Sequence, residues 1–201
     1  MGDLILLRHG ETEWSAAGKH TGRTDVPLTA RGAAAAAAAG TVLAARPVAA
    51  VFTSPANRAM RTAELAGLTG GKQDPDLWEW DYGGYEGMTT AQIQRQWPGW
   101  NLWRDGVIEG DAAHPGETVD AVGARADRVI ARASAFLPDG DVVLVAHGHV
   151  LRVLAARWLG LPASGGRLFR LDTGTISALG FEHDDPVISA WNMPPSGNKL
   201  I

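Results

Sequence analysis

The stretch LILLRHGETEW, residues 4–14, joins an apolar run to a cation, an imidazole and a glycine. Leu4–Leu7 has the length and composition of a buried β-strand, and Arg8, His9 and Gly10 follow it directly. In open α/β folds, ligands bind outside the carboxyl ends of the strands. The stretch therefore predicts either a ligand site at a sheet edge or a buried strand with a polar exit, and the rest of the chain must decide.

The composition is that of one ordinary soluble globular domain of 201 residues, with 45% apolar and 20% charged residues. The formal charge of −4 argues against nucleic acid and anionic membranes as partners. Fifteen of the 18 cationic residues are arginines, which suit the recognition of phosphate or carboxylate. A local anion site is therefore compatible with the acidic total.

Cysteine is absent, which excludes disulfides, cysteine nucleophiles and cysteine-ligated zinc. The start of the sequence lacks a basic region before its short apolar run, unlike a signal peptide. No window approaches the ~20 apolar residues of a membrane span. We expect a cytoplasmic protein.

Strand-like and helical patterns alternate along the chain. Strands are predicted over 4–7, 48–52 and 142–146, with a last β region over 168–181 and 187–191; helices are predicted over 30–45, 57–68, 118–136 and 149–158. This alternation predicts an α/β fold, a three-layer α/β/α sandwich around a mostly parallel central sheet. Neither a linker nor a repeat divides the chain, so residues 1–201 are expected to form a single domain.

The connection at about residues 74–115 is the irregular part. It holds five of the eight tryptophans and both tyrosines: Trp78, Trp80, Trp97, Trp100, Trp103, Tyr82 and Tyr85. Most of these rings fit a satellite hydrophobic cluster under a long connection. One or two of them suit a wall or cap over a substrate site.

Three predicted strands end in chemically active residues. The first ends in Arg8-His9, the second is followed by Thr53-Ser54-Pro55 and Arg58, and the third ends in His147-Gly148-His149. If these strands are parallel neighbours, two histidines and two arginines meet at one sheet edge, near helix N-termini that attract anions. This arrangement predicts a phosphate site. A zinc site formed by His9, His147 and His149 is the alternative, which the neighbouring arginines oppose.

Five ordered motifs resemble those of one family, the histidine phosphatase superfamily, which includes cofactor-dependent phosphoglycerate mutases and many phosphomonoesterases. They are RHGETEW, TGRTDVPLTARG, TSPANRAMRTAEL, EWDYGGYEGM and VAHGHVLR, and together they span nearly the whole chain. Within the family, the sequence is most similar to fungal sedoheptulose-1,7-bisphosphatases and actinobacterial acid phosphatases. The resemblance implies the phosphoglycerate mutase-like fold and a reaction that needs neither a metal nor a cofactor.

The resemblance also implies the catalytic roles. His9 would accept the phosphoryl group as a phosphohistidine, and Arg8, Arg58 and His147 would surround its oxygens. Glu79 would protonate the leaving oxygen and later take a proton from water. Other residues would bind substrate: Ser15, His20, Thr21, Gly22, Tyr82, Gly148 and Arg152. Ser15 stands where many members carry Asn, and it agrees with the bisphosphatase-like branch.

Three functions fit this reading. The first is a phosphomonoesterase acting on a small phosphorylated metabolite, with a sugar phosphate or bisphosphate preferred. The second is a cofactor-dependent phosphoglycerate mutase, and the third is a non-catalytic phosphate-binding module. Residues 84–117 contain no Lys and no Arg pair but five carboxylates, which favours hydrolysis over retention of an anionic intermediate: Glu86, Asp105, Glu109, Asp111 and Glu117. The substrate skeleton and any homo-oligomer stay open.

Overall fold

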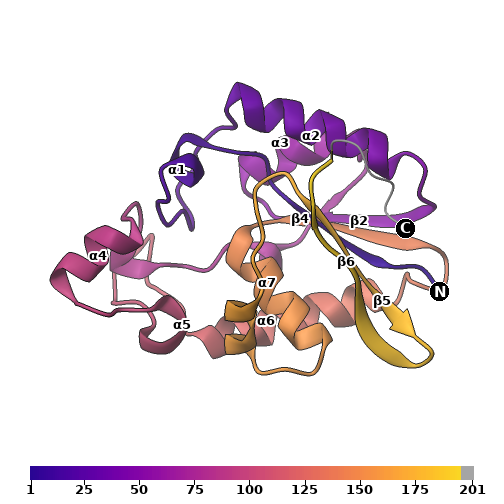
Figure 1. The fold of residues 1–201 in the computed structure, drawn as a ribbon. Coiled ribbons are helices and arrows are strands. Elements are labelled where there is room, and N and C mark those ends of the chain that lie inside the picture. The colour runs from indigo at the N-terminus through magenta and orange to yellow at the C-terminus, as the bar shows by residue number, and fades with distance from the viewer. Residues whose placement is uncertain (196–201) are drawn as a thin grey trace.

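The computed structural model describes residues 1–195, which build a six-stranded sheet between two layers of helices (Figure 1). The strand order is β3-β2-β4-β1-β5-β6. The strands are β1 Leu4–Arg8, β2 Val48–Thr53, β3 Lys72–Gln73, β4 Asp141–Ala146, β5 Ile176–Glu182 and β6 Asp185–Met193. Helices α2 Ala30–Leu43 and α3 Asn57–Leu65 cover one face, and α6 Val119–Ser134 and α7 Gly148–Trp158 cover the other. The predicted three-layer α/β fold is confirmed.

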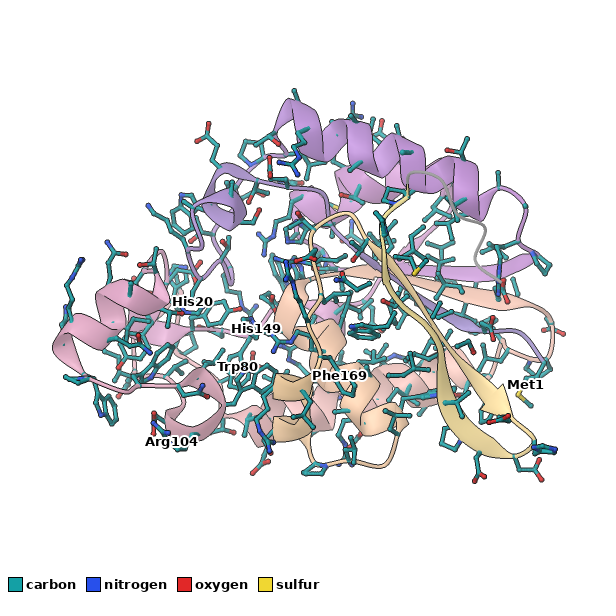
Figure 2. The ribbon with its side chains drawn as sticks, in the orientation of Figure 1. Met1, His20, Trp80, Arg104, His149 and Phe169 are labelled. Atoms are coloured by element: carbon teal, nitrogen blue, oxygen red, sulfur yellow. The ribbon has the colours of Figure 1, made fainter. Side chains whose placement is uncertain are left out.

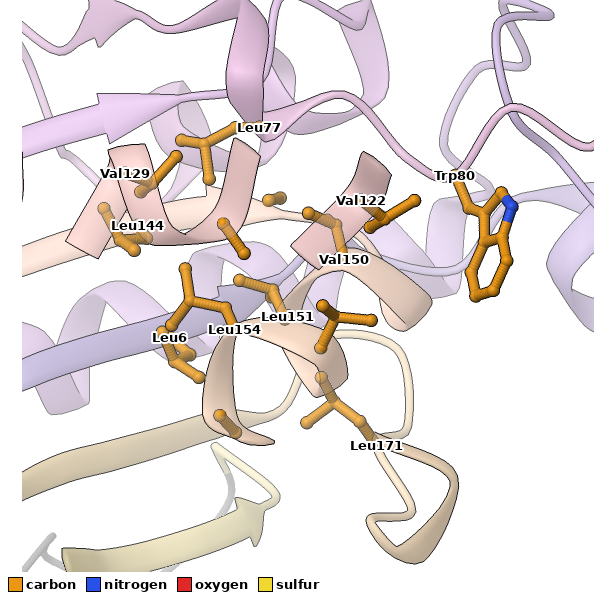
Figure 3. Packing of buried hydrophobic residues seen from close by; sticks show 14 of the residues in the cluster. Leu6, Leu77, Trp80, Val122, Val129, Leu144, Val150, Leu151, Leu154 and Leu171 are labelled. Carbon is orange, nitrogen blue, oxygen red and sulfur yellow. The ribbon is translucent and has the colours of Figure 1, made fainter. Parts of the chain in front are cut away.

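Side chains of β1 alternate between the two faces of the sheet, as the period of a strand requires. Leu4 and Leu6 join the core beneath α6 and α7, where Leu6 packs near Leu154 (Figure 3). Ile5 and Leu7 join the core beneath α2 and α3. The strand is therefore buried on both sides, which explains its continuous apolar sequence.

Helix α2 begins where the sequence predicts, because the Thr29 hydroxyl accepts a hydrogen bond from Gly32 N at 3.0 Å. Its alanine run lets the helix approach the sheet closely, with Ala36 and Ala39 fully buried. The helix ends at Leu43, two residues before the predicted end. Pro47 limits any further extension of the helix, because it disfavours helical geometry at Arg46.

The three site-bearing strands run in parallel. β4 pairs in parallel with β1 on one side and with β2 on the other, so their carboxyl ends meet at one edge. β5 then pairs antiparallel with β1, and β6 pairs antiparallel with β5. The sheet is therefore mostly parallel in its centre and antiparallel toward β6.

The last β region starts at Ile176, so the predicted start at residue 168 is wrong. Residues Ala163–Leu168 form a 3-10 helix, η3, and the segment after it turns back over the end of β1. There Gly174 N donates to the carbonyls of Arg8 and His9, and Arg8 N donates to Thr175 O. The backbone groups of this segment are satisfied by capping a strand instead of extending one.

The connection between β3 and α6 contains short helices: η1 Pro75–Leu77, η2 Gly83–Tyr85, α4 Thr90–Gln96 and α5 Leu102–Asp105. Trp80, Trp100, Tyr82 and Tyr85 are buried in the main core, while Trp97 is 48% exposed. Most of the rings are thus structural. Another short helix, α1 Glu13–Ala16, lies beyond the end of β1.

Candidate active site

The ends of β1 and β4 bring His9 and His147 together. His9 follows β1, and His147 is the N-cap residue of α7 directly after β4. Their ring centroids lie 5.1 Å apart with the planes at 63°, and both side chains are buried. The two histidines predicted from separate motifs therefore share one site.

His9 presents a neutral ring with one nitrogen free to react. Its Nδ1 lies 2.7 Å from the carbonyl of Gly10, and since a carbonyl only accepts, Nδ1 carries the proton and Nε2 keeps its lone pair. Burial, followed by the charges of Arg58 and Arg8, lowers the pKa of His9 well below its usual value. This is the state that a nitrogen nucleophile needs.

Gly10 holds this geometry through its lack of a side chain. A Cβ there would lie 2.3 Å from the carbonyl oxygen of Gly32 at the start of α2. The backbone N–H of Gly10 also donates to the buried Thr62 hydroxyl at 3.0 Å. The strand exit is therefore fixed by α2 and α3 together.

His147 is held in one tautomer by two partners. Arg58 Nε donates to its Nδ1 at 3.1 Å, so its Nε2 carries the proton and donates to Ser54 Oγ at 2.7 Å. Burial, followed by the charge of Arg58, lowers the pKa of His147 well below the usual value. Sequence analysis assigned no role to Ser54, although it follows the end of β2 and is fully buried.

Arg8 carries a buried donor that could bind an anion. One Nη donates to the carbonyl of Leu171, whereas its buried Nε has no hydrogen-bond partner within residues 1–195. Burial lowers the pKa of Arg8, although the charge of Glu79 opposes that shift. A buried donor without an acceptor is costly, and a phosphate oxygen would satisfy it.

Gly148 makes room for Arg8. A Cβ at Gly148 would lie 3.1 Å from the guanidinium carbon and 3.3 Å from Nε. Position 148 begins α7, so the arginine packs against the first residue of the helix.

Arg58 joins the site to the loop at residues 21–24. Its terminal nitrogens donate to the carbonyls of Thr24 (2.8 Å), Gly22 (2.8 Å) and Thr21 (3.2 Å). On the other side of the loop, the Glu86 carboxylate accepts from Gly22 N at 2.9 and 3.0 Å and from Thr24 N at 3.2 Å. The loop peptides thus point their N–H groups at an anion and their carbonyls at a cation.

This arrangement changes the predicted role of Gly22. Its N–H already binds Glu86, so a contact with phosphate would require the carboxylate to leave. Thr21 contributes its carbonyl to Arg58, and its hydroxyl donates to Lys19 O. Both residues support Arg58 in this structure.

Glu79 lies at the N-terminus of α7. Its carboxylate accepts from His149 N, Val150 N and Trp80 N, each at 2.9 Å. The free N–H groups of a helix N-terminus suit such an anion. Since His147 caps the same helix, the predicted general acid and the predicted phosphate-binding histidine are fixed to one element.

A neutral aromatic cluster lies beside Glu79. Tyr82 Oη and His149 Nδ1 are 2.7 Å apart, and the His20 ring lies 4.7 Å from the Tyr82 ring. Burial lowers the pKa of His20 to about 4 and that of His149 well below its usual value, and it raises the pKa of Tyr82. Figure 2 shows His20, His149 and Trp80 where the connection meets α7.

Arg152 lies at the rim of this cluster. Its guanidinium packs 4.8 Å from the Trp103 ring, and its Nε donates to Gly166 O at 3.1 Å. The neighbouring Trp103 ring also lies 5.4 Å from His149. The structure thus places Arg152, His20 and Tyr82 in one neighbourhood.

Two other residues, Ser15 and Arg61, use their side chains for structural contacts. Ser15 forms a capping box with Thr12 at the start of α1, where Ser15 Oγ accepts from Thr12 N at 2.9 Å. Arg61, which had no assigned substrate role, is exposed and pairs with Glu64. The hydroxyl of Ser15 is therefore already used locally.

Several of the five carboxylates in residues 84–117 are held by contacts with other residues. Glu86 binds the loop at residues 21–24, Glu117 pairs with Arg125, and Asp105 pairs with Arg104. The two ion pairs neutralise Asp105 and Glu117, and Glu86 is hydrogen-bonded by backbone N–H groups. The expectation that they repel an anionic intermediate is therefore weakened, because a paired carboxylate has little field left to act at a distance.

Residues 1–195 contain no group of three or more His, Cys, Asp or Glu side chains arranged for a metal ion. His147 in particular has both ring nitrogens engaged by Arg58 and Ser54. In the same part of the chain, no helix is both long and apolar enough to cross a membrane.

Comparison with known proteins identifies the family of this chain. The sequence model of the histidine phosphatase superfamily (branch 1) matches residues 4–194. The chain belongs to the histidine phosphatase superfamily. This histidine phosphatase is 44% identical to an acid phosphatase of Mycobacterium tuberculosis over 184 residues, covering 90% of this chain and 87% of that one.

More distant relatives carry other names. A sedoheptulose 1,7-bisphosphatase of Saccharomyces cerevisiae is 37% identical over 189 residues, covering 78% of this chain and 67% of that protein. A probable phosphoglycerate mutase of Salmonella choleraesuis is 31% identical, covering 97% and 92%. Among solved structures, the product of a Mycobacterium tuberculosis open reading frame superposes with a TM-score of 0.90 at 40% identity, covering 96% and 98%.

Proposed function

We propose that this histidine phosphatase hydrolyses phosphate monoesters of small sugars through a phosphohistidine at His9. The observation that carries the proposal is the state of His9. Its Nδ1 is tied to Gly10 O, its ring is neutral, and it shares a buried site with Arg8, whose Nε has no hydrogen-bond partner in the part of the chain that the structure describes. A neutral nitrogen beside unsatisfied positive charge suits attack on a phosphate dianion.

In the first step, Nε2 of His9 forms a bond to phosphorus as the bond from phosphorus to the leaving oxygen breaks. Arg8 and Arg58 stabilise the charge on the equatorial oxygens. Glu79 gives its proton to the leaving oxygen, so an alcohol departs instead of an alkoxide.

In the second step, water attacks the phosphorus of phospho-His9 and the nitrogen–phosphorus bond breaks. Glu79, now a carboxylate, takes the proton from the water. Inorganic phosphate leaves, and His9 and Glu79 return to their starting states. His147 has both ring nitrogens bound to Arg58 and Ser54, so it acts through Arg58, whose Nε it holds beside the site in both steps.

A sugar phosphate is the preferred substrate. The partly buried rings of His20 and Trp103, which lie beside the Tyr82 and His149 rings, suit the faces of a sugar or polyol better than a second carboxylate. Arg152 at the rim offers charge for a further phosphate, in line with the bisphosphatase named among the relatives. The cytoplasmic location expected from the sequence stays a prediction.

Rapid quench with a phosphorus-labelled sugar phosphate tests the proposal. It should trap an acid-labile, base-stable adduct on His9, and His9→Ala should lose both adduct and turnover. Turnover near the wild-type rate in His9→Ala would refute the mechanism. Loss of turnover with retained phosphate binding would also separate an enzyme from a non-catalytic phosphate-binding module.

A further inference from the structure

The segment that carries Glu79 depends on a buried ion pair outside the predicted site. Residues 78–82 belong to no helix or strand. Glu79 and Asp81 are nevertheless almost fully buried, so the backbone around them needs partners other than a ladder or a helix. Arg125, on the buried face of α6, and Glu117, just before that helix, supply them.

All five N–H donors of Arg125 are used in these contacts. Its Nε and one Nη hold the Glu117 carboxylate in a fork, each at 3.0 Å. The remaining donors reach three backbone carbonyls, those of Asp76 (2.8 Å), Trp78 and Glu79 (3.1 Å). The side chain is 6% exposed, so no donor is left for solvent or substrate.

Glu117 also contacts the two residues that follow Glu79. Its carboxylate accepts from Asp81 N at 2.9 Å, and its backbone N–H donates to Asp81 O at 3.0 Å. Its carbonyl accepts from the Trp80 indole at 2.9 Å. The pair therefore contacts residues on both sides of Glu79 as well as Glu79 itself.

We propose that Arg125, with Glu117, is a positioning residue for the general acid Glu79. The α7 N-terminus holds the carboxylate end of Glu79, and Arg125 on α6 holds its backbone end. The carboxylate can then serve the leaving oxygen only at the place that α6 and α7 define together. This inference rests on the proposed role of Glu79.

The geometry requires arginine at position 125. Only its planar fork can grip a carboxylate through two nitrogens and still reach three carbonyls, whereas lysine offers three donors on a single nitrogen. Arg125→Lys keeps the charge and loses the fork. Its effect therefore falls on the position of Glu79 more than on the local charge.

The leaving group reports on that position. A sugar phosphate releases a poor leaving oxygen that needs the proton of Glu79, whereas p-nitrophenyl phosphate releases a stable anion that does not. We expect Arg125→Lys to lower kcat for a sugar phosphate at least tenfold more than kcat for p-nitrophenyl phosphate. Glu79→Gln should show the same selective loss.

Arg128→Lys is the matched control. Arg128 lies on α6, one turn after residue 125, and pairs with the side chain of Asp76 without reaching a carbonyl of residues 76–79. Its ratio of the two rates should stay within twofold of wild type. Thermal melting of each variant checks that the fold is intact at the assay temperature.

A folded Arg125→Lys that loses activity equally on both substrates, or loses none, would overturn the inference. If Glu79→Gln still showed the selective loss, the proposed function would stand. Loss without selectivity in Glu79→Gln would overturn the proposed role of Glu79, and this inference with it. Should Arg125→Lys melt below the assay temperature, Glu117→Gln carries the same expectation and the same refutation, because it keeps the side-chain volume and weakens the fork.

Discussion

Replacing Gly148 by alanine should damage catalysis without damaging the fold. The added Cβ would stand 3.1 Å from the guanidinium carbon of Arg8, whereas carbon atoms in good contact lie about 3.5–4.0 Å apart. The arginine must therefore retreat by about 0.5 Å. A hydrogen bond of ordinary length, about 2.9 Å, would be stretched beyond 3.2 Å by such a movement.

The size of the effect follows from the hydrogen bond that is lost. A hydrogen bond to a charged group contributes about 1.5–3 kcal/mol, so losing one of Arg8 to phosphate lowers kcat/KM about 10–150-fold. Stability should change little, because Gly148 has no positive φ that would strain an alanine and only the Arg8 side chain has to move.

A double-mutant cycle with Arg8→Ala tests this cause directly. Steady-state kinetics on one sugar phosphate would give kcat/KM for wild type, both single variants and the double variant, with urea unfolding of each. In the Arg8→Ala background, Gly148→Ala should cost less than about threefold, because its target is gone. A full additional loss there, or a single variant within twofold of wild type, would refute the reasoning.

Three further predictions concern the loop, the aromatic cluster and the reaction outcome. Glu86→Gln should weaken competitive inhibition by orthophosphate about tenfold, because the loop that holds Arg58 loses its anion; an unchanged inhibition constant would contradict this. The folded pKa of His20, about 4, lies below its usual 6.5, so the unfolded chain takes up the proton first and stability falls as pH drops below 6.5. Between pH 7 and 5 this loss is about 2 kcal/mol, and it should vanish in His20→Gln when urea unfolding is compared at both values; an equal pH dependence in the two proteins would count against it. With 3-phosphoglycerate and catalytic 2,3-bisphosphoglycerate, phosphate release should outrun formation of 2-phosphoglycerate; isomerisation tenfold faster, about 1.4 kcal/mol in barrier, would indicate a mutase.

The parts of the site that follow strands could be predicted because strand patterns are local. His9 and His147 each follow a continuous apolar run, so their meeting at one edge needed only the parallel pairing of β1 with β4. Ser54 was visible at the end of the second predicted strand but had no role until the orientation of His147 was known. The role of Ser54 follows from its tertiary contact with His147 and not from a sequence pattern.

Arg125 could not be predicted as part of the site. On a helix with one apolar face, a single arginine is typical of an exposed position, and its partners are carbonyls that no side-chain pattern reveals. The same limit applies to Gly22, whose N–H is taken by a carboxylate from another motif. The start of β5 was misplaced for a related reason, since the segment before it caps β1 through backbone groups alone.

The position of β1 in the sheet has a consequence for synthesis of the chain. This strand leaves the ribosome first, yet its two neighbours, β4 and β5, contain residues 141–146 and 176–182. At a synthesis rate of about 5–20 residues per second, β1 stays uncovered for on the order of ten seconds or more before β4 and β5 have been made. Such distant pairing also slows folding itself. This apolar strand is therefore a natural target for chaperones on the nascent chain, and shortening the chain before β5 would leave that strand permanently open to aggregation.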